Sequence, residues 1–166
     1  MFGGRGSSPP PNNVKEKIMA ITWGELKGHI VDLGFEEDDI TLEYQRIMIN
    51  ATNHALQIIT SIVVPQIEGY YQTNQSWGYE EVDDDGKTKW KLPKPKKITA
   101  ETEDDQKINL PDNLLPLLPL LASHYIWLDD DITKAVMYWN QYDQLKEQII
   151  AVCRSGKGAV IEGGWG

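Results

Sequence analysis

The sequence predicts a mainly α protein, a helical bundle of about four helices with a β-hairpin insertion and extended N- and C-terminal arms. Two long segments, at about residues 41–63 and 132–154, repeat apolar residues at three- and four-residue steps, the period of a helix with one buried face. Between them, at about residues 70–110, short apolar and polar runs surround turn residues, which favours a β insertion. Glycine, serine, proline and asparagine dominate the start of the chain, and we expect residues 1–20 to be a flexible arm.

Composition and charge limit the classes of protein to consider. With 166 residues, 25% of them charged and 40% hydrophobic, the chain suits one helical domain at residues 21–155 and a C-terminal tail at residues 156–166. The formal net charge of −9 argues against a surface that binds nucleic acid or anionic lipid on all sides. No run of about 18 apolar residues occurs, so we expect no membrane partner. Cys153 is the single cysteine, which indicates a reducing compartment and no disulfide framework.

A capping box predicts the start of the first helix. In the sequence Thr22-Trp23-Gly24-Glu25, the Thr22 hydroxyl and the Glu25 carboxylate can each accept from the other residue's backbone N–H. We expect Gly34 to end this helix. Its buried side is predicted to carry Trp23, Leu26 and Ile30.

The long helix at about residues 41–63 follows the acidic stretch at residues 36–39. We expect Pro65 to end or kink it, because proline lacks a backbone N–H. The predicted apolar stripe is Tyr44, Ile47, Met48, Ala51, Ala55, Ile58, Ile59 and Ile62.

The β insertion is predicted to contain two hairpins. WGYEEV and KTKWKL flank DDDG, which favours a tight turn between two strands. A weaker pair, KKITA and QKINL, flanks ETEDD. Pro93 and Pro95 separate the two hairpins, since proline cannot donate to the ladder of a central strand.

The stretch LPDNLLPLLPLLASHYIWLDDD, residues 110–131, combines apolar density with three prolines. Asp112 is predicted to be the N-cap of a helix, and Pro116 and Pro119 are tolerated in or near its first turn. This helix is predicted to run to about Trp127. Because it is apolar nearly all round, one layer of four helices leaves part of it uncovered, and we expect a neighbouring subunit to cover that part. The candidate contact residues are Leu117, Leu120, Leu121 and Trp127.

The three aspartates at residues 129–131 are predicted to form a turn and to cap the last helix, about residues 132–154. The two helices then form an αα-hairpin. The predicted apolar stripe of the last helix is Ala135, Val136, Trp139, Tyr142, Leu145, Ile149 and Val152.

The sequence predicts no catalytic site, no metal and no cofactor. Residues 81–86 superficially resemble a calcium loop, but the twelfth position is Leu92, where an EF-hand needs an acid. His29, His54 and His124 fall on three different helices without a partner at ligand spacing. No GxSxG, Walker or GxGxxG pattern occurs. We therefore expect a protein that is not an enzyme.

Six of the 16 basic residues gather between residues 87 and 97. One interpretation is phosphate contact, with Trp90 stacking on a base. The interpretation we favour is a solvated hairpin whose lysines prevent edge pairing and answer the acids of the preceding strand. Contact with an acidic protein neighbour is compatible with both. The candidate residues are Lys87, Lys89, Trp90, Lys91, Lys94, Lys96 and Lys97.

The tail GAVIEGGWG places Val160, Ile161 and Trp165 among glycines. Glycine lets a backbone lie close to another surface, and tryptophan is a common interface anchor. We expect a docking tail; a disordered end is the alternative.

The order of these segments resembles a known family. A TWGEL helix, a long amphipathic helix, a β insertion closing with INLPD, the helix LLPLLPLLASHYIWLDDD and the helix ITKAVMYWNQYDQLKEQI are similar to the head–tail adaptor (connector, or head-completion) proteins of tailed bacteriophages. The resemblance covers about residues 20–154 and is a pattern of residue types, most telling at residues 108–148. The β insertion is longer and richer in tryptophan than the family pattern.

The resemblance implies a virion protein of the head–tail joint that assembles in the host cytoplasm. It implies a subunit of a homo-oligomeric, twelvefold ring that docks on the portal protein through its C-terminal tail and carries the tail or a tail-completion protein. DNA is then only passing cargo, and an acidic chain suits such a conduit because a negative wall repels phosphates.

Two other classes stay open. If the chain is a small-terminase-like packaging protein, we expect it to bind duplex DNA with an affinity that falls as salt rises. A helical nucleotide hydrolase predicts magnesium-dependent turnover.

Overall fold

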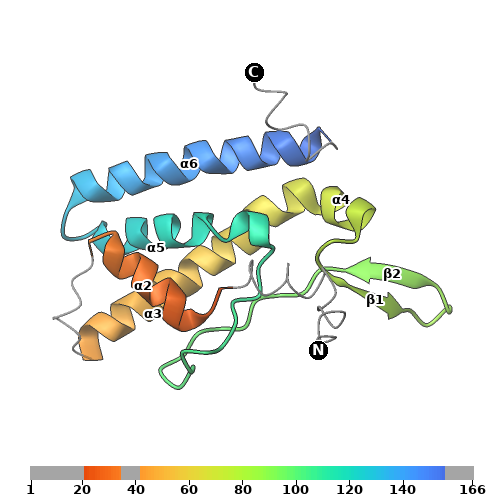
Figure 1. The fold of residues 1–166 in the computed structure, drawn as a ribbon, viewed down its shortest axis with the longest axis horizontal. Helices are drawn as coiled ribbons and strands as arrows, with labels where there is room; N and C mark the ends of the chain where they lie inside the picture. The colour runs from red at the N-terminus through yellow and green to blue at the C-terminus, as the bar shows by residue number, and fades with distance from the viewer. Residues whose placement is uncertain (1–20, 35–41, 156–166) are drawn as a thin grey trace, which may run out of the picture.

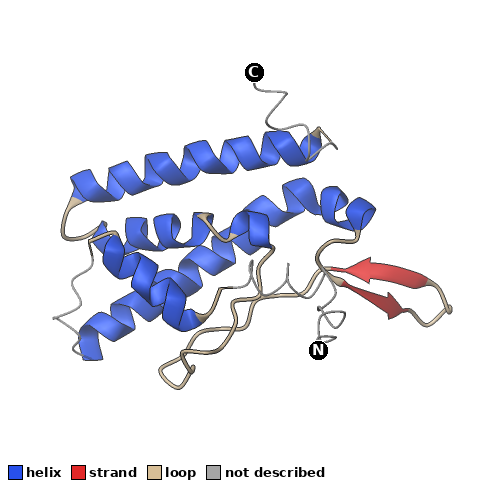
Figure 2. Cartoon of the chain, in the orientation of Figure 1, coloured by secondary structure: helices blue, strands red, loops and turns tan. Residues whose placement is uncertain are grey.

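The computed structural model describes residues 21–34 and 42–155, which form a mainly helical protein with one small β-hairpin (Figures 1 and 2). The predicted fold class is confirmed. The predicted arm at residues 1–20, the acidic stretch and the tail at residues 156–166 lie outside the described residues. The elements in chain order are α2 (Trp23–Asp32), α3 (Leu42–Ile58), the π-helical turn η3 (Ile59–Val63), α4 (Val64–Asn74), β1 (Tyr79–Val82), β2 (Thr88–Lys91), the 3-10 turn η4 (Asp112–Leu114), α5 (Leu117–Trp127) and α6 (Ile132–Arg154).

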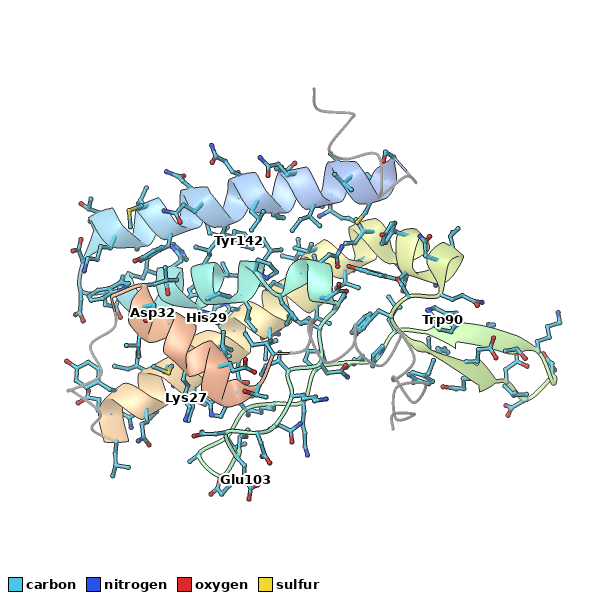
Figure 3. The ribbon with its side chains drawn as sticks, viewed as in Figure 1. Lys27, His29, Asp32, Trp90, Glu103 and Tyr142 are labelled. Atoms are coloured by element: carbon cyan, nitrogen blue, oxygen red, sulfur yellow. The ribbon has the colours of Figure 1, made fainter. Side chains whose placement is uncertain are left out.

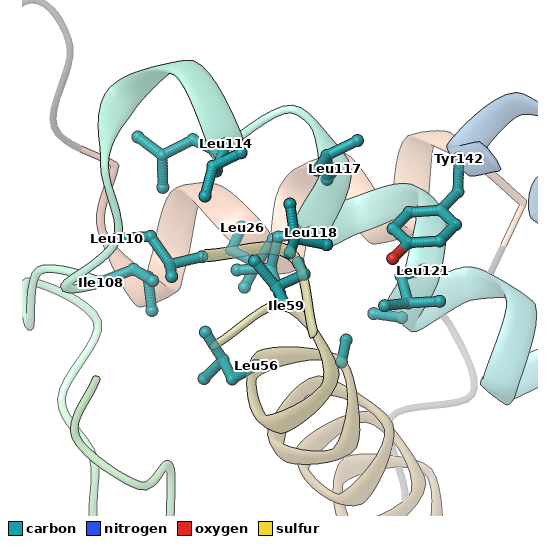
Figure 4. Close-up of a cluster of buried hydrophobic side chains, with 14 of the residues drawn as sticks. Leu26, Leu56, Ile59, Ile108, Leu110, Leu114, Leu117, Leu118, Leu121 and Tyr142 are labelled. Carbon is teal, nitrogen blue, oxygen red and sulfur yellow. The ribbon is translucent and has the colours of Figure 1, made fainter. Parts of the chain in front are cut away.

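Helix α5 lies at the centre of the bundle, between α3 and α6, with α2 also packed against it (Figure 1). Its leucines fill the core because α2, α3 and α6 pack against it and present apolar side chains to them. Figure 4 shows Leu118 and Leu121 beside Leu26 of α2, Ile59 of η3 and Tyr142 of α6.

The capping box of α2 is confirmed. The Thr22 N–H donates to Glu25 Oε1 at 3.1 Å, and the Glu25 N–H donates to Thr22 Oγ1 at 3.1 Å. The three predicted apolar side chains of α2 are buried. Gly34 follows the helix with φ +112°, the left-handed conformation that glycine adopts without a steric cost.

The long helix continues beyond its predicted end. At Pro65 the chain stays helical because the π turn η3 comes first and places the proline in the first turn of α4, where a missing N–H is tolerated. The predicted kink is found at Ile67, and the helix then reaches Asn74. The wider π turn brings Val63 to the buried face, so Ile62, predicted to be buried, is exposed.

The first predicted hairpin is confirmed: β1 and β2 pair antiparallel, with Tyr79 opposite Lys91 and Val82 opposite Thr88. The helical extension of α4 means that β structure starts at Tyr79, not near residue 70.

The second predicted hairpin is wrong. Residues 92–111 form no strand, and the predicted second strand pairs with the start of α2 instead. The Trp23 N–H donates to the Gln106 carbonyl at 2.8 Å, and the Ile108 N–H donates to the Ile21 carbonyl at 2.9 Å. The predicted first strand is held by Asn53 of α3, whose amide exchanges two hydrogen bonds, of 2.8 and 2.9 Å, with the backbone of Ile98.

The prolines before α5 act as predicted, but the cap does not. Asp112 lies inside η4, which has no side-chain cap, and α5 starts after Pro116 with Pro119 in its first turn. The cap of α6 is confirmed, because Asp131 Oδ1 accepts from the Lys134 N–H at 3.2 Å.

The buried stripe of α6 differs from the predicted one. Tyr138, Ile150 and Cys153 are buried, whereas Val136 and Trp139 are exposed. The helix is turned so that Ala135, Tyr138 and Tyr142 face the bundle.

Candidate interaction surfaces

The hairpin β1–β2 projects from the end of the molecule where α4 ends (Figure 1). Its base is fixed by Trp90, whose indole Nε1–H donates to the Trp77 carbonyl at 3.1 Å (Figure 3). Gly78, at φ +139°, allows the indole to lie against the backbone, since a Cβ there would be 2.6 Å from Trp90 Nε1. Trp90, a predicted contact residue, is therefore largely engaged in holding the hairpin.

All six candidate lysines of residues 87–97 are exposed. The segment contains none of the chain's 25 acidic residues. The register places Glu81 opposite Lys89, yet the ion pairs of the described residues involve Lys27 and Lys146 instead. The prediction that these lysines answer the acids of the preceding strand is thus not met by an ion pair in the part of the chain that the structure describes. The segment is a positively charged surface available to a partner.

A second surface lies at the start of α6. Four apolar side chains in the turn before α6 and in its first half are exposed: Leu128 (41%), Ile132 (60%), Val136 (47%) and Trp139 (37%). We call these four residues the α6 stripe. Spacings of four and three residues place Ile132, Val136 and Trp139 side by side along one face of α6, and Leu128 precedes them at the end of α5. Such a contiguous apolar face on a small protein usually marks a contact surface.

Acidic groups border the α6 stripe. Asp129 and Asp130 are exposed in the turn before α6, and Asp131 caps the helix. The nearest cation on this helix, Lys134, has its Nζ 4.2 Å from the centroid of the Trp127 ring. Farther along α6 the exposed positions carry Asn140, Gln141, Gln144 and Gln148, so the apolar surface is confined to the first half of the helix.

Two of the four predicted subunit contacts on α5 need correction. Leu117 and Leu121 are completely covered by their own chain and have no surface left for a neighbour. Leu120 and Trp127 are half-buried at the margin of the core. The sequence predicted that Val136 and Trp139 are buried, because they fit a helical repeat with the buried residues of α6. The signal that the sequence offered was the second apolar repeat, Leu128, Ile132 and Val136, at four-residue steps.

A hollow of about 640 Å³ lies between α2, α3 and the loop at residues 99–104. Lys27 and Glu103 mark its neighbourhood in Figure 3. Its walls include Trp23, Met48 and Thr102, and across it the Lys27 Nζ lies 2.6 Å from Asp104 Oδ1. Lys27 and Asp104 form an ion pair with each other. The hollow is therefore lined by apolar and polar side chains, but this lysine and this carboxylate do not form a catalytic pair.

Two of the three histidines, His54 and His124, have structural contacts. His54 stacks on Tyr125 with ring centroids 4.2 Å apart, and His124 Nδ1 lies 2.8 Å from the Ala135 carbonyl oxygen. His29 is exposed on α2. Within residues 21–34 and 42–155, no three His, Cys, Asp or Glu side chains are placed to hold a metal ion.

Cys153 belongs to a buried network and is not an activated nucleophile. Burial raises the pKa of its thiol, and the hydrogen bond from Asn113, at 3.4 Å, lowers it less. The hydroxyl of Tyr71 donates to Asn113 Oδ1 at 2.6 Å, and burial likewise raises the pKa of Tyr71. These groups join α4, η4 and α6 and stay protonated at neutral pH.

The continuous helix at Leu42–Asn74 is long and apolar enough to cross a membrane by length and composition, and 44% of its most apolar window is buried inside the protein. Core helices of soluble proteins meet the same criteria, so this feature does not by itself indicate a membrane partner.

No protein-family model matches the chain, and neither a curated protein nor a solved structure is detectably similar to it.

Proposed function

We propose that the chain is a structural subunit of the head–tail connector of a tailed bacteriophage. Copies of it form a closed ring that docks on the portal protein, carries the tail or a tail-completion protein, and lets DNA pass. Two features support the proposal: the order of segments along the sequence, which resembles the connector family, and the exposed surfaces of the folded chain. It assigns no catalytic role and no cofactor.

The observation that carries the proposal is the α6 stripe. The chain buries a hydrophobic core around α5. It nevertheless leaves the four large apolar side chains of the α6 stripe exposed, in the turn before α6 and in its first half. Covering them removes apolar area from water, which favours association. A subunit that works only in an assembly needs such a surface, and an isolated hydrolase does not.

Mass measurement is the direct test. Native mass spectrometry of the full chain, alone and with a portal ring, is expected to detect a cyclic, twelvefold species in at least the second sample. A chain that remains monomeric and unbound in the presence of portal rings contradicts the proposal.

The tail at residues 156–166 is proposed to bind the portal through Val160, Ile161 and Trp165. Each tail binds weakly, because ordering its glycines opposes the burial of three side chains, and the ring makes attachment secure through avidity. Deletion of residues 156–166 is expected to abolish co-purification with portal-bearing heads. Undiminished attachment would transfer portal docking to the helical domain.

The unpaired lysines of residues 87–97 favour one further candidate, a duplex-DNA-binding packaging protein. Its signature is affinity for DNA that falls steeply with salt, by about one power of the salt concentration for each phosphate contacted. Fluorescence anisotropy with a labelled duplex at two salt concentrations separates this candidate from a connector subunit, which needs no such affinity.

A further inference from the structure

We propose that the hairpins of neighbouring copies pair edge to edge, so that β2 of one copy adds to β1 of the next. This inference rests on the proposed ring and names one contact that repeats around it. The partner is a second copy of the chain, recognised by the open edges of the two strands and by the charges on them.

Both edges of the hairpin are open. It projects from the helical body (Figure 1), and among the described residues no third strand pairs with β1 or β2. The Asp83 N–H donates to the Lys87 carbonyl at 2.8 Å, which makes these two residues a hydrogen-bonded pair. Such pairs alternate with pairs whose backbone groups point away from the partner strand. The register assigns the outward groups to Glu80, Val82, Thr88 and Trp90.

The two faces of the hairpin are less suitable for docking than its edges. Side chains alternate between the faces of a strand, so the exposed apolar residues of β1, Tyr79 and Val82, lie on opposite faces. Neither face therefore presents a contiguous apolar patch. A two-stranded hairpin is only marginally stable in water, and strands added at its edges stabilise it.

The two edges carry opposite charges. Strand β1 contains Glu80 and Glu81 and no base, whereas β2 contains Lys89 and Lys91 and no acid. The turn at residues 83–87, with three acids and one lysine, lies beyond the strands. Like charges opposite each other destabilise a strand pair, and opposite charges stabilise it. Pairing of β1 with β1, or of β2 with β2, is therefore disfavoured, and the lysines select an acidic edge.

Strand direction makes this contact suitable for a ring. Strands β1 and β2 are antiparallel, so β2 and the next copy's β1 are also antiparallel when two hairpins lie side by side in the same orientation. A contact between two different edges is heterologous, which is the type of contact that closes into a ring. Neighbouring hairpins would then lie about 10 Å apart, the width of two strands.

A second copy suits the hairpin better than other partners do. Phosphates of a nucleic acid attract the lysines of β2, but the glutamates of β1 in the same small sheet repel them. An acidic peptide strand pairs with β2 and leaves the edge of β1 open. A neighbouring copy on each side provides a partner of opposite charge for both edges.

Disulfide formation in rings assembled on the portal tests the contact. Full chains with Thr88→Cys are mixed with affinity-tagged full chains that carry Val82→Cys or Glu80→Cys, the positions of β1 with outward backbone groups. The control is Glu81→Cys, which is also exposed but lies on the opposite face of the strand. Each chain has one new cysteine, so no disulfide forms within a hairpin, and Cys153 is buried.

We expect Thr88→Cys to react at least about tenfold faster with Val82→Cys or with Glu80→Cys, whichever lies opposite it, than with Glu81→Cys. The reason is that paired residues on one face bring their Cβ atoms within disulfide distance. Equal rates, or a faster reaction at Glu81, overturn the proposal. Equally fast disulfide formation between Val82→Cys copies alone also overturns it, because like edges then pair.

A charge-swapped chain separates the contact between copies from the stability of the hairpin itself. This chain combines Glu80→Lys and Glu81→Lys with Lys89→Glu and Lys91→Glu, so identical copies still present opposite charges to each other. We expect it to form rings alone. In a mixture with the isotopically labelled wild-type chain, native mass spectrometry should detect mixed rings at least about fivefold less often than random assembly predicts. Random mixing overturns the proposal.

The matched control swaps the same number of charges outside the hairpin. It combines Glu101→Lys and Glu103→Lys with Lys94→Glu and Lys96→Glu, all at exposed positions of the following loop, and it should mix with the wild-type chain at random. If rings form on the portal without the expected disulfides, the connector function stands and the edge contact is wrong. If no ring forms with the portal, the connector function fails, and the edge contact fails with it.

Discussion

Helix α5 and the first half of α6 are both rich in apolar residues, yet their own chain covers one and leaves the other open. Six residues of α5 are buried, among them Leu117, Leu118 and Leu121. On α6, the stripe residues Ile132 and Val136 remain exposed one helix away. Apolar density along the sequence therefore does not reveal which helix is covered by its own chain.

The difference in burial between α5 and α6 comes from the number of helices packed around each of them. Helix α5 has α3 and α2 against it, with α6 on another side. Helix α6 packs on α5 through one face, and α4 meets it as well. Only its face toward the bundle is covered in the first half, where Ala135 and Tyr138 are buried.

The largest expected effect tests the covered helix. Leu118→Ala should lower the free energy of unfolding by about 3 kcal/mol, because it deletes a fully buried side chain and leaves a cavity. Val136→Ala, on the exposed stripe, should change it by less than about 0.5 kcal/mol. Urea unfolding of both variants measures the contrast. Similar losses at both positions would show that the stripe is packed in the single chain.

Much of the helical fold was predictable from local chemistry. The capping box at Thr22 and the cap at Asp131 were identified because each needs only neighbouring residues. The hairpin at Asp83–Gly86 was predictable for the same reason. There the Asp83 carboxylate accepts from two N–H groups of its own turn, those of Asp85 and Lys87.

The errors in the prediction arose where the structure of a segment depends on residues far away in the sequence. The strand predicted near Ile108 exists as an extended segment, but its partner is Ile21, more than eighty positions earlier, and no local pattern indicates that pairing. On α6, Val136 and Tyr138 are both compatible with a helical stripe, and only the position of α5 selects Tyr138. For the same reason, two of the four candidate contact residues on α5, Leu117 and Leu121, are buried in the core.

The second prediction concerns the loop that packs on α3, which Asn53 holds through the backbone of Ile98. Asn53→Ala should cost about 2 kcal/mol, since it breaks both hydrogen bonds to Ile98 and leaves a buried segment of loop without its partners. Asn140→Ala, on the exposed side of α6, is the control and should be close to neutral. Thermal unfolding followed by circular dichroism compares the two, and equal stability would mean that the loop is held by its apolar contacts alone.

The third prediction concerns Tyr71 of α4, which is linked through Asn113 to Cys153 in the second half of α6. Burial raises the pKa of Tyr71, so the folded protein retains a proton that the unfolded chain loses near pH 10. Stability from this group is complete below about pH 10 and falls above it, by up to about 1.4 kcal/mol per pH unit. Tyr71→Phe should reduce the alkaline slope of the unfolding free energy between pH 10 and 11. An unchanged slope would show that Tyr71 ionises normally.

The smallest effect tests Lys134, in the part of α6 where the stripe is exposed. Lys134 extends from the first turn of α6, with its Nζ 4.2 Å from the centroid of the Trp127 ring. Lys134→Met keeps most of the aliphatic stem and removes the charge, so it isolates the cation–π contribution, which should be about 0.5–1 kcal/mol. The comparison is with Lys107→Met, an exposed lysine without an aromatic contact in the described residues. Equal urea midpoints for the two variants would mean that the ammonium group of Lys134 contributes no measurable stability through its contact with the Trp127 ring.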